Sequence, residues 1–80
     1  MPLYYLHVTE DSRIAEDQEG SELDSVSCAV ELAIASAQEI MADSLRGGRP
    51  LGLGRRILIE DQDHQTVATV TFAQALPREE

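Results

Sequence analysis

The side chains of this chain that could do chemistry begin with an acidic stretch, DQEGSEL, at residues 17–23. It holds three carboxylates and a glycine just before an alanine-rich segment, and closely spaced carboxylates can bind a hard cation such as calcium. An EF-hand type of loop needs glycine at its sixth position and glutamate at its twelfth. A count from Asp17 gives Glu22 and Cys28 at those positions. We therefore predict no metal site here, and we interpret the stretch as a structural lead-in to a helix carried by Asp17, Gly20, Glu22 and Leu23.

This interpretation makes specific claims about the backbone. Gly20 is expected to hold a positive φ that other residues resist. Asp24 or Ser25 is expected to accept a hydrogen bond from an early helical amide as the helix N-cap. The acidic side chains then have no special partner, so replacing Asp17 and Glu19 by their amides should change stability little.

The second candidate group is an arginine-rich loop within GGRPLGLGRR, residues 47–56. The loop lacks the Gly-Lys-Ser/Thr of a Walker A motif and the third glycine of a dinucleotide fingerprint. With the arginine that precedes it, it forms a basic island with no acid inside it: Arg46, Arg49, Arg55 and Arg56. Such an island can contact a phosphate, a nucleic acid or an acidic partner. It can equally be a surface loop that offsets an acidic protein.

His7 is the third candidate, because with the acidic loop it could form a small-ligand or enzymatic site. That role needs a pocket and a convergent set of polar groups, and the sequence names no such set. His7, His64 and Cys28 do not have the spacing of a zinc site. Cys28 falls opposite the apolar stripe of the expected helix and is interpreted as an inert thiol. We predict no catalytic residue, no bound cofactor and a non-enzymatic protein.

The elements that position these residues follow from hydrophobic periodicity. Residues 3–8 and 13–16 are expected to be strands, and residues 56–61 and 65–72 a hairpin. From residue 24 to residue 48 the period is helical, with a stripe of Val26, Ala29, Val30, Ala33, Ile34, Ala37, Ile40, Met41 and Leu45. Gly47 or Gly48 should end the helix in a left-handed conformation. The order β(β)αββ predicts an α+β fold, an antiparallel sheet of three to four strands with one long helix on one face. It forms a single domain over residues 1–76 with a frayed tail at 77–80.

Length, charge and cysteine content narrow the function classes. The chain has 80 residues and a net charge of −9, from 15 acidic and 6 basic side chains. Such a charge disfavours nucleic acid and anionic membranes as partners. One cysteine allows no internal disulfide, and neither a secretory leader nor a stretch of some eighteen apolar residues is present. A cytoplasmic protein is the expectation.

Several motifs occur together in an order that resembles a family of small uncharacterised proteins common in rhizobia and related alphaproteobacteria. The motifs are MPLYYLHV, DQEGSEL, MADSLRGGRPL and ILIEDQDHQTVATVTFAQAL. The matching residues are Tyr4, His7, Val8, Asp17, Gly20, Glu22, Leu23, Phe72, Ala75 and Leu76. In that family a glycine usually stands where this chain has His64, so the last turn is expected to be strained or of another type. The resemblance implies the fold and a bacterial origin but no reaction.

One helix can cover only one face of the expected sheet, so the other face is left partly apolar. Depending on register, that open face carries one of two sets of side chains from the first strand. These are either Leu3, Tyr5 and His7 or Tyr4, Leu6 and Val8. An uncovered apolar patch commonly marks a partner site. We therefore expect a protein interaction or regulatory module that binds a protein partner or a second copy, and whose candidate surface is Tyr5, His7, Arg46, Arg49, Arg55 and Arg56.

Overall fold

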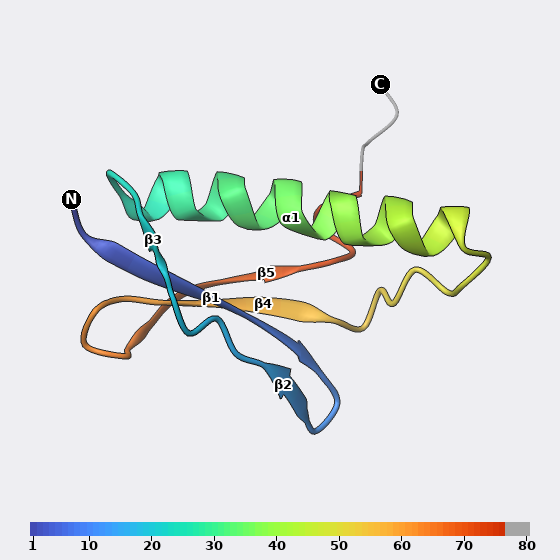
Figure 1. The fold of residues 1–80 in the computed structure, drawn as a ribbon, viewed down its shortest axis with the longest axis horizontal. Coiled ribbons are helices and arrows are strands. Elements are labelled where there is room, and N and C mark those ends of the chain that lie inside the picture. The colour runs from blue at the N-terminus through green and yellow to red at the C-terminus, as the bar shows by residue number, and fades with distance from the viewer. Residues whose placement is uncertain (77–80) are drawn as a thin grey trace.

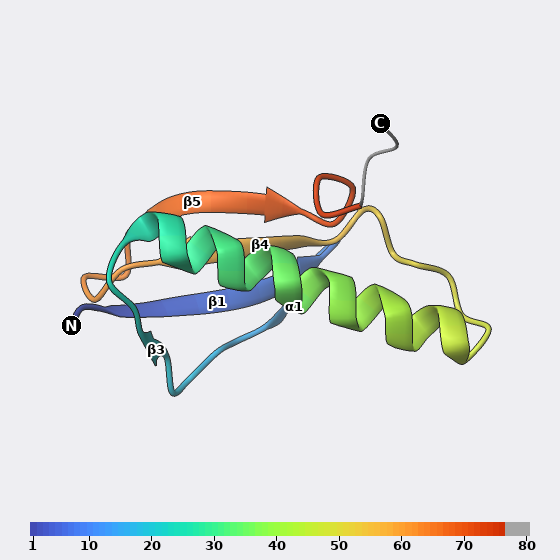
Figure 2. The same cartoon turned by 90° about the horizontal axis from the view of Figure 1, so that it is seen from above.

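Strand β1 (Leu3–Glu10) pairs with other strands along both of its edges in the computed structural model, which describes residues 1–76. One edge of β1 pairs with β4 (Arg56–Glu60), and β4 pairs with β5 (Thr66–Thr71), all antiparallel. The other edge pairs with two short strands, β2 (Arg13–Ala15) and β3 (Ser21–Glu22). The sheet order is β2-β1-β4-β5, with β3 also pairing with β1, and Figure 2 shows β1, β4 and β5 side by side in that order. The predicted α+β class and element order are confirmed, and β3 is an addition that the sequence did not predict.

Helix α1 (Val26–Arg46) packs on one face of this sheet and leaves the other face uncovered (Figure 1). Ser25 is its N-cap, because the Ser25 hydroxyl accepts a hydrogen bond of 3.3 Å from the amide of Cys28. At the other end Gly47 has an ordinary φ of −84°, and Gly48 takes the left-handed conformation with a φ of 70°. Both ends therefore form where the sequence predicts them.

The core lies between α1 and the central strands. Ala29, Ala33 and Ala37 are fully buried, and their small side chains let the helix lie close to the sheet. Across from them the largest fully buried side chains are Phe72, Ile57 and Ile59. The N-terminal strand adds Tyr4, which is buried, together with the partly buried Leu6 and Val8.

The C-terminal end of α1 corrects one part of the predicted stripe. Leu45 was expected to face the core, but it is 70% exposed, and Val26 at the other end is 37% exposed. Figure 2 shows why at the C-terminal end: the last turns of α1 project beyond the ends of β4 and β5. Periodicity correctly gives the side of the helix that faces the sheet, but it does not say where the sheet ends.

The β4–β5 connection contains the strained turn that the resemblance predicted. The Asp61 carboxylate accepts hydrogen bonds from the amides of Asp63 and Gln65, at 2.9 and 3.0 Å. His64 then takes a φ of 62°, in the left-handed region that favours glycine. Within residues 1–76 no helix combines the length and the apolar character that crossing a bilayer requires. The predicted frayed tail at residues 77–80 lies outside the described part of the chain.

Candidate functional site

The face of the sheet opposite α1 is the first candidate surface. Register decides which side chains it carries, because direct cross-strand partners point to the same side. Ile57 and Ile59 face the helix, so Leu58 between them faces away, and its partner in β1 is His7. Tyr5 and Glu60 are also direct partners on this side. Of the two alternatives left open by the sequence, the face with Tyr5 and His7 is therefore the uncovered one.

His7 is fixed on this face by hydrogen bonds at both ring nitrogens. Its Nδ1 accepts a hydrogen bond from the backbone amide of Asp17 at 3.0 Å. Since that nitrogen must be unprotonated to accept, the neutral ring carries its hydrogen on Nε2. Nε2 donates to the Glu60 carboxylate, 3.0 Å away. The His7 side chain is only 13% exposed. Both nitrogens are thus engaged inside the protein, so the geometry gives His7 no free position at which to act as a base or ligand.

Asp17 in the acidic stretch has a definite structural task. Residues 16–20 bulge out between β2 and β3, so that these five residues stand opposite the three residues 5–7 of β1. The bulge would leave backbone amides without partners. The Asp17 carboxylate accepts from the amide of Leu6 at 3.2 Å and from that of Gly20 at 3.0 Å. Asp17 therefore supplies the acceptor that the bulge removes from Leu6 of β1, and its second bond closes the bulge at Gly20. From this geometry we expect the Asp17 charge to matter to stability, in place of the small effect expected from the sequence.

The rest of the DQEGSEL stretch closes the same edge of the sheet. Gly20 has the positive φ that was predicted, at 73°. A Cβ there would lie 3.0 Å from the Tyr5 ring and 3.3 Å from the Tyr4 carbonyl oxygen. Leu23 donates its amide to the carbonyl of Pro2 at 3.0 Å and packs against the core. Glu22 is exposed and pairs through its backbone with β1. In residues 1–76 no group of three or more His, Cys, Asp or Glu side chains gathers as a metal site would require.

An aromatic row runs along the open face beside this edge. The rings of Tyr5 and His7 are stacked, with centroids 6.4 Å apart and planes 5° from parallel. Tyr5 also stacks on His64, with ring centroids 5.7 Å apart and planes 30° from parallel. The Oε1 atom of Glu60 lies 3.0 Å from His7 Nε2 and 3.6 Å from His64 Nδ1. The Glu60 carboxylate thus fixes the His7 ring through a hydrogen bond, and it lies near the exposed His64 ring without a hydrogen bond to it.

Next to the row lies a hollow of about 200 Å³, lined by His7, Ile14, Glu16, Leu58 and Glu60. Ile14 reaches it from β2, as the direct partner of Thr9, and is 58% exposed. The sequence did not single out Ile14, Glu16, Leu58, His64 or Glu60 as surface candidates. The signal that could have found Leu58 and Glu60 is the strand alternation of RILIE, which places them opposite the two isoleucines.

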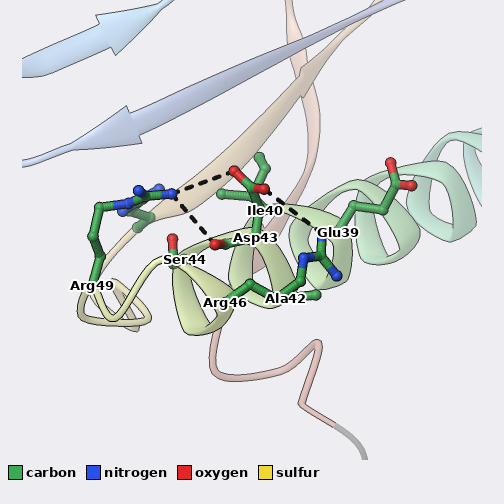
Figure 3. Close-up of a pocket in the computed structure, with 8 residues that line it drawn as sticks. Glu39, Ile40, Ala42, Asp43, Ser44, Arg46 and Arg49 are labelled. Atoms are coloured by element: carbon green, nitrogen blue, oxygen red, sulfur yellow. Dashed lines mark hydrogen bonds and ion pairs between the residues drawn. The ribbon is translucent and has the colours of Figure 1, made fainter.

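The arginine-rich loop forms a separate hollow at the C-terminal end of α1 (Figure 3). This hollow has a volume of about 570 Å³ and is lined in part by Arg46, Arg49 and Arg55. Asp43 lies between two of these arginines, 3.7 Å from Arg46 and 3.3 Å from Arg49 (Figure 3). The Asp43 carboxylate therefore partly neutralises the positive charge of these arginines, which an anionic ligand would need for binding.

The other two arginines of the predicted island point to different faces of the sheet. Arg55 pairs with Glu10 at 2.9 Å and lies over the Phe72 ring, 5.6 Å from its centroid. Arg56 follows it on the alternate side, opposite Thr9, and does not line the hollow. Three of the four arginines thus line one hollow, and Arg56 lies apart from them. Because each of the three already pairs with Asp43 or Glu10, the phosphate and nucleic-acid alternatives are weakened.

Comparison with known proteins places the chain in a family. The comparisons with curated proteins and with solved structures each returned no match. The family described as Domain of unknown function (DUF6894) matches residues 3–73. This range runs from the first residue of β1 to just beyond β5, so it contains the sheet, the helix and the acidic stretch. The chain therefore belongs to the DUF6894 family of domains of unknown function.

Proposed function

We propose that this domain is a non-catalytic protein–protein interaction module that binds its partner through the open sheet face. The observation that carries the proposal is the uncovered face itself: α1 packs on one side of the sheet only (Figure 1). The opposite side presents Ile14, Leu58 and the Tyr5 ring next to a hollow. In a domain this small, an apolar surface left without a covering layer is a candidate partner site.

The electrostatics favour a different protein over a second copy as the partner. Each chain has a net charge of −9, so two copies repel each other on approach. A partner with a neutral or basic surface meets no such penalty. Cys28, a free and partly buried thiol, is compatible with a reducing compartment, and we place the interaction in the cytoplasm.

The two other functions have less support. A catalytic or small-ligand role for His7 lacks a free ring nitrogen, since both already have protein partners. Phosphate or nucleic acid at the arginine-rich loop would be repelled by the Asp43 carboxylate in the hollow and by the overall negative charge of the chain. Neither role has a specific observation in its favour.

The proposal can be tested by affinity capture with two matched variants. Ile14→Ser removes an exposed apolar side chain from the open face, and Leu32→Ser removes one from the exposed side of α1. We expect a partner captured by the unmodified domain to be lost with Ile14→Ser and kept with Leu32→Ser. Equal capture by both variants would contradict the choice of face. A concentration-dependent dimer in light scattering, lost in Ile14→Ser, would instead identify a second copy as the partner.

A further inference from the structure

The hollow on the open face has the size and the lining of a receptor for one side chain. Ligand pockets for small molecules typically enclose about 300–1,000 Å³, whereas this hollow has about 200 Å³. Ile14 and Leu58 supply apolar lining, and Glu16 and Glu60 contribute two carboxylates to the same hollow. Such a lining matches a side chain with an aliphatic stem and a cationic head, as in arginine and lysine.

One of the two carboxylates in the hollow, that of Glu60, is held in place by a hydrogen bond. Oε1 of Glu60 accepts the His7 hydrogen bond, which fixes the position of this carboxylate, and the side chain is 23% exposed. Its Oε2 has no hydrogen-bond or ion-pair partner within the described residues. Glu16 is exposed and likewise forms no ion pair with any residue from 1 to 76. Two carboxylates are therefore available to one incoming cation.

The nearest fixed positive charge on the face does not cancel this preference. Arg56 lies on the same side of β4 as Glu60, four residues away along the strand. At about 3.3 Å per residue their backbone positions are roughly 13 Å apart. Arg56 does not line the hollow and forms no ion pair with Glu16 or Glu60, so within residues 1–76 it neutralises neither carboxylate.

From these observations we propose that the hollow receives an arginine or lysine side chain of the protein partner. The proposal rests on the open face being the binding surface. The cationic head lies between Glu16 and Glu60, and the aliphatic stem covers Ile14 and Leu58. Glu60 accepts with its free oxygen while its other oxygen keeps the His7 hydrogen bond, so binding requires no rearrangement of the aromatic row.

The test uses the peptide acetyl-Gly-Ala-Arg-Ala-Gly-amide, with a second peptide in which citrulline, a neutral isostere, replaces arginine. The two peptides are titrated into ¹⁵N-labelled domain and followed by amide chemical shifts. We expect the arginine peptide to shift the amides of His7, Ile14, Leu58 and Glu60, and the citrulline peptide to leave them in place. Glu16→Gln with Glu60→Gln should weaken arginine-peptide binding by about tenfold, as expected for the loss of two partly exposed ion pairs.

A control with the same net charge separates this site from general attraction to an acidic protein. Glu31→Gln with Glu39→Gln removes two exposed carboxylates from α1 and should leave binding nearly unchanged. Equal weakening by both double variants, or shifts spread over all acidic residues, would overturn the proposal. If the peptide does not bind but partner capture still depends on Ile14, the interaction face stands and the cationic contact is wrong. If capture is also independent of Ile14, the proposed function falls as well.

Discussion

Replacing Asp17 by asparagine should destabilise the domain markedly, although the residue lies in an acidic loop. The Asp17 carboxylate accepts two backbone amides, those of Leu6 and Gly20. A hydrogen bond to a charged group contributes roughly 1.5–3 kcal/mol. Asparagine has one acceptor oxygen, so one amide loses its partner and faces an NH₂ group. Because the loop is only partly buried, we expect a loss near the lower end, about 1.5–2 kcal/mol, and about 3 kcal/mol for Asp17→Ala, which loses both bonds.

These losses are large for a domain of this size, whose free energy of unfolding is expected to be about 4–12 kcal/mol. At about 4–8 °C per kcal/mol, Asp17→Asn should lower the melting temperature by about 6–16 °C. Thermal and urea unfolding followed by circular dichroism measure the change. Glu19→Gln is the control, because Glu19 is exposed and has no bonded partner in residues 1–76, so its effect should stay within about 0.5 kcal/mol. If the two variants unfold alike, the assigned role of Asp17 is wrong.

Three further predictions concern the same region of the sheet. His64→Gly should be more stable than His64→Ala by about 1 kcal/mol, because both lack the imidazole and only glycine accepts the φ of 62° without strain; equal urea midpoints would contradict this. Gly20→Ala should destabilise by about 1–3 kcal/mol, since the new methyl group combines a φ of 73° with a 3.0 Å approach to Tyr5; an unchanged melting curve would show that the loop moves freely. Neutral His7 should carry its hydrogen on Nε2, which long-range ¹H–¹⁵N spectra report directly, and Glu60→Ala should leave this preference in place, because the Asp17 amide still donates to Nδ1; a hydrogen on Nδ1 in either protein would contradict this.

The parts of this fold that could be predicted from sequence are those that depend on local chemistry. The helix, its Ser25 cap and the left-handed Gly20 follow from residues close together in the chain, whereas the strain at His64 was expected only from the family resemblance. The His7–Glu60 contact could not be predicted in the same way, because its partners are 53 residues apart. They meet only through the register between β1 and β4, which a single sequence does not specify.

The role of Asp17 was missed for a related reason. The local sequence shows only that Asp17 is an acidic residue in a loop. Such a side chain is usually interpreted as pointing into solvent without a protein partner. The hydrogen bonds of Asp17 become understandable only from the strand pairing, because the loop bulges out where β1 has neither β2 nor β3 beside it. Likewise the arginines of one short loop looked like a single basic surface. Strand alternation at Arg55 and Arg56 divides them between two faces.

The position of β1 between its partners also sets the order in which the protein can be built. β1 is synthesised before its main partner β4, which follows some fifty residues later, as the 53-residue separation of His7 and Glu60 illustrates. At synthesis rates of about 5–20 residues per second, that interval lasts roughly 3–10 s. During this time the β1–β2 hairpin has no sheet to join, and its apolar side chains have no core. The sheet can therefore close only once β4 has been made, and the nascent chain must stay free of wrong pairings until then.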